Sequence, residues 1–233
     1  MKEYRPFEIL DDLSKEEEIC VIWLNGDPSS IGTHLETVWN KKGAWRVVTD
    51  GGLQEIHRRR EVRWPHAICG DFDSIDRKLD TKGAKIIHTP DQNSTDATKA
   101  IKWCLEQKNE WHFNRIVLLG GLNGRFDHTM STLSTLCQFL EVTVVVLDST
   151  NMVFALPEGT SRIHVDLKKT TRMCGVIPIS QKSTVVTSKG LKYEMESLPL
   201  AFGVLISSSN EVTTDLIELE STAPLIFTIE LKF

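Results

Sequence analysis

The sequence of 233 residues lacks several features that would assign it to a particular class of protein. Its five cysteines are an odd number at wide spacings with no CxxC pair, so neither a disulfide framework nor a zinc site is indicated. The first 18 residues contain no apolar signal segment, and no apolar run approaches the roughly 18 residues of a membrane span. These absences predict a cytoplasmic protein that has no membrane partner.

A large excess of positive charge is also missing. Lysine and arginine number 27 against 32 aspartates and glutamates, which gives a formal net charge of −5. Because dedicated nucleic-acid-binding proteins are usually basic, we expect no nucleic-acid partner. A small anionic ligand remains compatible with this composition, because a few local donors are enough to hold a phosphate in an acidic protein.

Two patterns of hydrophobicity divide the chain near residue 155. Before it, short apolar runs alternate with amphipathic stretches, which is typical of a parallel sheet covered by helices. After it, apolar and polar residues alternate strictly, as in 163–168 and 227–233, which is typical of half-buried antiparallel strands. The apolar runs lie at 19–24, 44–52, 65–74, 84–91, 115–121 and 142–148.

Two helices stand out within the first part. One is expected at 94–105, with Ser94 or Thr95 as its N-cap and Asp96 in its first turn, where the helix dipole favours an acid. The second follows Gly124 and carries one continuous apolar stripe at helical spacing. The stripe comprises Phe126, Met130, Leu133, Cys137 and Leu140.

Acidic side chains follow several of the expected strands at the point where each strand ends. Asp71 and Asp73 follow one strand, Asp96 follows the next, and Asp127 comes shortly after a third. In a parallel sheet these loops open at the same carboxyl edge, where ligands bind. Taken singly, each acid is a turn or cap residue. Together at one edge, they favour a site for a hard cation, because clustered carboxylates repel one another unless a cation neutralises them.

A glycine-rich segment, 120–125, connects a buried strand to a helix. Glycines let the backbone approach phosphate oxygens closely, and Arg125 would add a bidentate contact. The segment is neither a Walker A loop nor a GxGxxG motif, so a tight structural connection is an alternative interpretation. Asp50, Gly51 and Gly52 form a similar turn at another strand end.

Three blocks of this sequence resemble the signature blocks of thiamine pyrophosphokinases: GDFDS at 70–74, PDQNSTDATKA at 90–100 and GGLNGRFDHTMSTL at 120–133. Three later segments are similar to the thiamine-binding domain of that family: GVIPIS at 175–180, GLKY at 190–193 and ISSSNE at 206–211. The chain departs from the family at Tyr193 and Phe227, where many members carry tryptophan, and at Ser208.

The resemblance implies an α/β fold, with an N-terminal parallel-sheet nucleotide-binding domain followed by a smaller C-terminal antiparallel β-sandwich domain. The catalytic domain would span 19–155 and the thiamine-binding domain 156–233, after an N-terminal extension at 1–18. The implied reaction is that of a thiamine diphosphokinase: ATP and thiamine give AMP and thiamine diphosphate, with Mg²⁺, in a homodimer.

The resemblance also implies roles for individual residues. Metal binding and catalysis would belong to Asp71, Asp73 and Asp96. Nucleotide binding would involve Asp50, Gly51, Gly121, Asn123, Gly124, Arg125 and Asp127. Thiamine would be contacted by Gln92, Ser209, Asn210 and Phe227. Two alternatives stay open: a metal-dependent nucleotide hydrolase or other nucleotide-using transferase, and a non-enzymatic sensor of thiamine or nucleotide.

Overall fold

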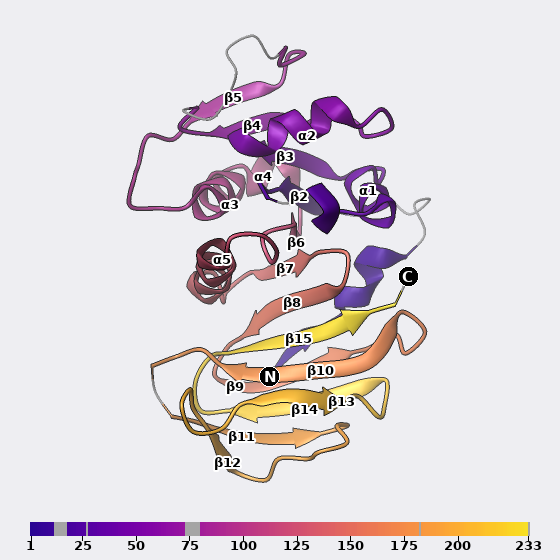
Figure 1. Cartoon of the computed structure of the whole chain (residues 1–233), viewed down its shortest axis with the longest axis vertical. Helices are drawn as coiled ribbons and strands as arrows, with labels where there is room; N and C mark the ends of the chain where they lie inside the picture. The colour runs from indigo at the N-terminus through magenta and orange to yellow at the C-terminus, as the bar shows by residue number, and fades with distance from the viewer. Residues whose placement is uncertain (12–17, 27, 73–79, 182, 233) are drawn as a thin grey trace. The chain divides into compact units, whose positions relative to one another are not determined.

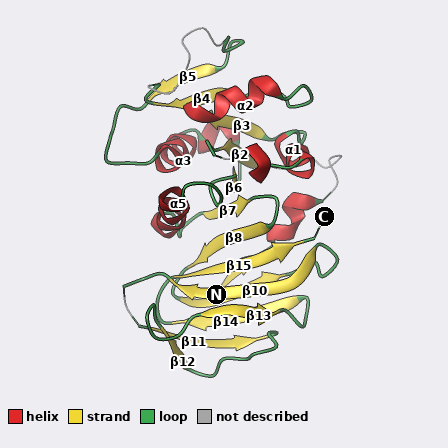
Figure 2. Ribbon diagram, in the orientation of Figure 1, coloured by secondary structure: helices red, strands yellow, loops and turns green. Residues whose placement is uncertain are grey.

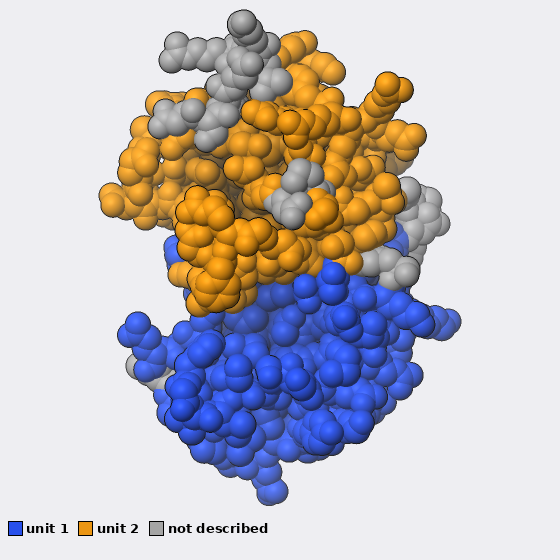
Figure 3. All heavy atoms as spheres, in the orientation of Figure 1, with its two compact units in different colours: residues 1–11, 136–145, 150–233 blue, residues 12–135, 146–149 orange. Residues whose placement is uncertain are grey.

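The computed structural model describes residues 1–11, 18–26, 28–72, 80–181 and 183–232. The chain forms two compact units, which Figure 3 shows in different colours. Unit 1 comprises residues 1–11, 136–145 and 150–233, and unit 2 comprises residues 12–135 and 146–149. No helix in the described ranges is long and apolar enough to cross a bilayer.

Unit 2 is built on parallel strands in the order β6-β2-β3-β4-β5, and every neighbouring pair is parallel (Figure 1). The strands are β2 (Ile19–Trp23), β3 (Trp45–Thr49), β4 (Ala67–Gly70), β5 (Lys85–His88) and β6 (Arg115–Leu119). They confirm five of the expected apolar runs. The sixth run is β7 (Thr143–Leu147), whose residues are divided between the two units.

Helical segments alternate with these strands (Figure 2). They are η2 (Pro28–Ser30), α1 (Thr33–Trp39), η3 (Asp50–Gly52), α2 (Leu53–Arg58), α3 (Asp96–Glu106), α4 (Lys108–Trp111) and α5 (Phe126–Gln138). Helix α3 packs against β2, β3 and β4. Its N-cap is Thr95, whose hydroxyl accepts a hydrogen bond from the Thr98 amide at 3.2 Å, so the structure selects Thr95 over Ser94.

Helix α5 forms where the periodicity predicts it, but its apolar stripe is not its buried face. Phe126 is 75% exposed and Met130 is 40% exposed, whereas Thr132 and Thr135 are buried. The Thr135 hydroxyl lies 2.9 Å from that of Thr98 on α3, so a hydrogen bond joins the two helices. Thr132 and Thr135 therefore form the packed face together with Leu136, and the large apolar side chains of the first turns face outward.

Unit 1 contains two groups of hydrogen-bonded strands. One has the order β1-β9-β14-β11-β12 and the other the order β13-β10-β15-β8. Within these two groups every neighbouring pair of strands is antiparallel except β1 with β9. The strands are β1 (Lys2–Tyr4), β8 (Asn151–Leu156), β9 (Gly159–His164), β10 (Thr170–Pro178), β11 (Thr184–Lys189), β12 (Leu198–Leu200), β13 (Ser207–Glu211), β14 (Leu216–Ser221) and β15 (Leu225–Leu231). The chain is therefore mixed α/β.

Aromatic rings join the two groups of strands in unit 1. Tyr4 on β1 stacks on Phe154 on β8 with ring centroids 5.5 Å apart, and Phe154 lies 5.5 Å from Phe227 on β15. Burial of such large rings is a major source of stability in a core of this kind.

The N-terminal residues are an integral part of unit 1 instead of an extension. Strand β1 pairs in parallel with β9, and the following η1 (Pro6–Leu10) buries Phe7 and Ile9. Strand β8 also belongs to unit 1, so the structural division differs from the break expected near residue 155. The sequence pattern did not reveal this arrangement because pairing of β1 with β9 depends on residues about 160 positions away.

Candidate functional site

A cavity of about 280 Å³ opens in unit 2 where the parallel strands end. Residues that follow or terminate each of the five strands line it, as expected for the carboxyl edge of a parallel sheet: Asn25, Thr49, Asp71, Gln92 and Gly121. Leu24, which directly follows β2, also lines the cavity. The remaining lining residues lie at the start of α3 and in the first half of α5. The fold thus brings together strand ends that are far apart in the sequence.

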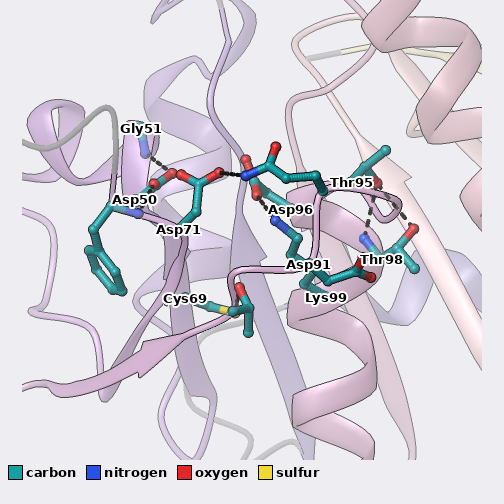
Figure 4. Close-up of polar contacts among 12 residues, drawn as sticks. Asp50, Gly51, Cys69, Asp71, Asp91, Thr95, Asp96, Thr98 and Lys99 are labelled. Atoms are coloured by element: carbon teal, nitrogen blue, oxygen red, sulfur yellow. Dashed lines mark hydrogen bonds and ion pairs between the residues drawn. The ribbon is translucent and has the colours of Figure 1, made fainter.

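Four of the residues expected to act in the site line this cavity: Asp71, Gln92, Asp96 and Gly121. The Gln92 side-chain amide donates to Asp71 Oδ2 at 3.4 Å, and Asp96 Oδ1 lies 3.3 Å from the Lys99 ammonium. Figure 4 shows Asp71 and Asp96 near one another in this region. The cavity therefore presents two carboxylates and one amide from the expected set.

Asp50 is 3% exposed and is not among the residues that line the cavity. Its Oδ1 accepts a hydrogen bond from the Gly51 amide at 2.6 Å, and its Oδ2 accepts one from the Phe72 amide at 2.9 Å (Figure 4). Burial raises the pKa of Asp50, and the negative charges of Asp96 and Asp71 raise it further. Its carboxylate thus joins the end of β3 to the turn after β4.

That turn has an unusual backbone. Phe72 has a φ of 64°, which is a left-handed conformation that side chains other than glycine seldom adopt. Gly70 precedes it, and a Cβ there would come within 2.4 Å of Asp50 Cγ. The Asp50 carboxylate therefore stabilises the turn that presents Asp71, and this close packing requires glycine at position 70. Asp73 lies outside the described residues.

The donor set is chemically suited to Mg²⁺. Asp71 and Asp96 offer hard carboxylate oxygens, which are the ligands that this ion prefers. Within the described ranges no group of three or more histidine, cysteine, aspartate or glutamate side chains is arranged to hold a metal ion. Two of the three expected ligands therefore line one cavity, and the third, Asp73, is not described.

The glycine-rich segment after β6 is tightly packed. Gly120, Gly121 and Gly124 have φ values of 84°, 86° and 86°, and a Cβ on Gly121 would come within 2.8 Å of Leu24 Cδ1. Gly121 lines the cavity, whereas Asn123 and Gly124 are exposed and do not. The Asn123 amide donates to Oδ2 of Asp148, a fully buried carboxylate, at 2.9 Å. This contact connects the segment to the end of β7.

Arg125 and Asp127 lie outside the cavity lining and pair with each other. Arg125 Nε donates to Asp127 Oδ1 at 3.1 Å, and Nη2 donates to Oδ2. The two side chains are 71% and 63% exposed. The hydrogen bond from Arg125 lowers the pKa of Asp127, and the surrounding water makes this exposed pair weak as a source of stability. The guanidinium is thus accessible to an incoming anion.

A second cavity, of about 320 Å³, lies in unit 1 and includes the expected residue Ser209. Tyr193 also lines it and is 62% exposed, so its ring is accessible. Leu198, Leu200 and Leu205 supply apolar surface beside serines 207–209, a combination common in sites for small organic ligands.

Asn210 and Phe227 are buried, with 1% and 0% of their surface exposed. The Asn210 side chain accepts a hydrogen bond from the Tyr193 amide at 3.0 Å and donates one to the Tyr193 carbonyl at 2.8 Å. Asn210 therefore holds the backbone of Tyr193, and Phe227 packs in the core against Phe154. Neither is among the residues that line the cavity.

Comparison with known proteins shows the family to which this chain belongs. Residues 35–147 match the family model for the thiamin pyrophosphokinase catalytic domain, and residues 160–226 match that for the thiamin pyrophosphokinase vitamin B1 binding domain. The chain is 56% identical to thiamin pyrophosphokinase 1 of Caenorhabditis elegans, over 99% of this chain and 96% of that protein. The chain belongs to the thiamin pyrophosphokinase family.

More distant members of the thiamin pyrophosphokinase family show the same relationship. Thiamine pyrophosphokinase 2 of Arabidopsis thaliana is 33% identical over 80% of this chain and 78% of its own length. The solved structure of thiamin pyrophosphokinase from Candida albicans is 25% identical and superposes with a TM-score of 0.82, covering 99% of this chain and 93% of that one. The yeast enzyme, at 19% identity and a TM-score of 0.84, has the same fold.

Each of the two thiamin pyrophosphokinase domain matches contains the residues of one cavity. All residues that line the cavity around Tyr193 and Ser209 in unit 1 fall within the vitamin B1 binding domain match. The residues that line the cavity of unit 2 fall within the catalytic domain match, except Leu24 and Asn25. Another cavity of unit 1, about 420 Å³ among Arg5, Glu8 and His164, contains none of the expected residues.

The structure also shows cavity residues that the sequence analysis did not select. Lys99 and His128 line the cavity of unit 2, and Lys99 pairs with Asp96 one helical turn earlier. The spacing of three residues in α3 was a usable signal, because positions three apart lie on the same side of a helix. His128 had no comparable signal, because a single histidine in a helix is usually structural.

Proposed function

We propose that this chain transfers the pyrophosphoryl group of ATP to the hydroxyl of thiamine, giving thiamine diphosphate and AMP. The observation that supports this most is the cavity at the strand ends of unit 2, which gathers Asp71, Gln92 and Asp96 in a member of the thiamin pyrophosphokinase family. These three residues come from the first two sequence blocks, and Gly121 of the third block lies beside them.

The reaction exchanges one bond to the β-phosphorus for another. The hydroxyl oxygen of thiamine forms a bond to this atom, the bond to the oxygen shared with the α-phosphate breaks, and AMP leaves with that oxygen. The hydroxyl proton passes to a carboxylate, for which Asp71 and Asp96 are available. Positioning and charge stabilisation therefore account for most of the catalysis that the protein must provide.

Asp71, Asp73 and Asp96 would hold Mg²⁺, which neutralises phosphate charge when it is bound. The buried carboxylate of Asp50 would keep the turn of Asp71 in place, which is a positioning role and not a contact with nucleotide. This assignment rests on the hydrogen bonds that its two oxygens already accept from the backbone amides of Gly51 and Phe72.

The nucleotide would lie along the glycine-rich segment after β6. Gly121 would allow the backbone to approach the phosphates, and Asn123 would keep Gly124 and its neighbours in position through Asp148. The exposed guanidinium of Arg125 would exchange part of its pairing with Asp127 for a bidentate contact with phosphate.

The cavity of unit 1 would bind thiamine through Ser209 and the ring of Tyr193, since both line it. Gln92, which lines the cavity of unit 2, is a further candidate for contact with thiamine. Asn210 and Phe227 would act indirectly, Asn210 by holding Tyr193 and Phe227 by supporting the core behind it.

We further propose a cytoplasmic homodimer. The large apolar side chains that remain exposed, among them Phe126 on α5 and Val204 at 84% exposed, offer surface that a second copy would cover. All five cysteines are free, which suits a reducing compartment. Sedimentation equilibrium tests the dimer, since a monomer at micromolar concentration would contradict it.

One assay tests the reaction against its alternatives. The protein is incubated with ATP, Mg²⁺ and thiamine, and AMP and thiamine diphosphate are separated by chromatography. The proposal requires both products in equal amounts. Turnover of ATP without thiamine would instead indicate a nucleotide hydrolase, and binding of thiamine without AMP release would indicate a sensor.

A further inference from the structure

Lys99 on α3 is the most buried charged side chain among those lining the cavity of unit 2. Its side chain is only 6% exposed, whereas that of its partner Asp96 is 42% exposed. An ammonium group has three donors, and the described part of the chain supplies one partner, Asp96 Oδ1 at 3.3 Å. Donor capacity therefore remains on a buried cation at the edge of a cavity.

Burial of such a cation is costly unless an anion compensates it, and one long contact to a half-exposed carboxylate compensates it poorly. The cavity is the adjacent space in which a further anion would fit. Arg125, the cation that the sequence suggested for phosphate binding, is 71% exposed and lies outside the cavity lining. Lys99 is therefore the cation that the structure offers inside the cavity.

We propose that Lys99 binds the β- and γ-phosphates of ATP directly, which rests on the proposed function. In the free protein its ammonium pairs with Asp96, and with nucleotide bound it also donates to a phosphate oxygen. A lysine suits this role because its ammonium is a point charge that serves any phosphate orientation. We infer that Lys99 contacts the pyrophosphoryl group of ATP that is transferred, and not the AMP portion. The reason is that Lys99 lies beside Asp96 and not beside Arg125.

A structural role makes different predictions. If Lys99 only orients the Asp96 carboxylate towards Mg²⁺, excess Mg²⁺ should restore the affinity for nucleotide in a variant. If Lys99 only stabilises α3 through its ion pair, the variant should unfold at lower temperature and bind nucleotide normally. Direct contact with phosphate predicts a loss of ATP affinity that saturating Mg²⁺ does not repair.

The test uses Lys99→Met, Lys99→Arg and, as a matched control, Lys102→Met, an exposed lysine on the same helix. Calorimetric titration at saturating Mg²⁺ measures binding of AMP and of α,β-methylene ATP, whose carbon bridge prevents transfer. Steady-state kinetics measures KM for ATP and for thiamine separately. Thermal unfolding of each variant reports its folding.

We expect Lys99→Met to bind α,β-methylene ATP about 10- to 100-fold more weakly, the effect of one charged hydrogen bond. Affinity for AMP and KM for thiamine should stay within about twofold, as should all values for Lys102→Met, an exposed charge. Lys99→Arg should recover part of the loss because it restores the charge. If Lys99→Met does not fold, Lys99→Gln takes its place with the same expectation.

Normal binding of the ATP analogue by folded Lys99→Met or Lys99→Gln, recovery of their binding with excess Mg²⁺, or an equal loss for AMP would each overturn the inference. These outcomes are separable from failure of the proposed function itself. If the unmodified protein binds no ATP analogue and releases no AMP with thiamine, the function is refuted and the inference with it.

Discussion

Replacement of Asp50 tests whether its buried carboxylate supports the backbone instead of contacting the nucleotide. Its two oxygens accept hydrogen bonds from the Gly51 and Phe72 amides. A fully buried amide left without an acceptor costs about 1 to 3 kcal/mol, and the amides of Gly51 and Phe72 are partly buried, so this range is an upper bound here. Asp50→Ala removes both acceptors, so we expect a loss of up to about 6 kcal/mol in the free energy of unfolding, and Asp50→Asn, which retains one carbonyl oxygen, about half of that.

Urea and thermal unfolding measure these losses. For a chain of this size, each kcal/mol corresponds to a fall in Tm of about 2 to 4 °C. Turnover of the folded fraction should also fall, because the turn that presents Asp71 would relax from its left-handed backbone at Phe72. The control is Glu110→Gln on α4, an exposed acid whose replacement should leave both quantities unchanged.

Two results would refute this reasoning. Unchanged unfolding energy in both Asp50 variants would show that the amides find other acceptors at no cost. Unchanged stability combined with a higher KM for ATP would assign Asp50 to the nucleotide directly, as the sequence analysis expected.

Four further predictions concern single residues. Asp71→Asn should fold normally and lose turnover by about 100-fold or more, measured as AMP release, because an anionic ligand is lost; normal rates at saturating Mg²⁺ would contradict this. Arg125→Lys should raise KM for ATP with Tm unchanged, because lysine lacks the planar, two-donor guanidinium group. An unchanged KM would mean that Arg125 only pairs with Asp127 and does not bind phosphate. Burial and an adjacent guanidinium lower the pKa of His66 to about 4, so the unfolded chain binds more protons as pH falls from 6.5 towards 4 and stability decreases in that window. His66→Gln should reduce the pH dependence of the free energy of unfolding, measured with urea, by about 1 to 2 kcal/mol, because the partial exposure of His66 weakens the effect. If the pH profiles of the variant and the unmodified protein run parallel, His66 is not the origin of this dependence. Asn210→Ala should raise KM for thiamine and leave KM for ATP unchanged, since it frees the Tyr193 backbone; equal changes in both would indicate general loosening.

The pattern of strands and helices in unit 2 could be predicted because it depends on local sequence. Apolar runs of strand length predicted β2 to β6, and the Ser94-Thr95 pair before Asp96 predicted the start of α3. The order of these strands along the sheet did not have to be known to place the strand-end residues together, because the carboxyl ends of parallel strands share one edge. That is why Asp71 and Asp96 could be grouped in advance.

Other features depended on contacts between distant residues. The periodicity of α5 located its apolar stripe but could not show which side faces α3, and small threonines occupy that side instead. Residues 1–11 carry no signal that they pair with β9, because strand pairing at long range depends on the partner and not on the segment alone.

The sequence by itself determined the chemistry available at the site: acids, glycines and an amide at strand ends, in blocks characteristic of one family. The tertiary structure alone decided where each group lies and what it contacts. The fold buries Asp50 and Asn210 against backbone amides, and it places Lys99 of α3 in the lining of the cavity of unit 2. Burial and hydrogen-bond partners are properties of the packed chain, and they separate a positioning residue from a contact residue of the same chemical type.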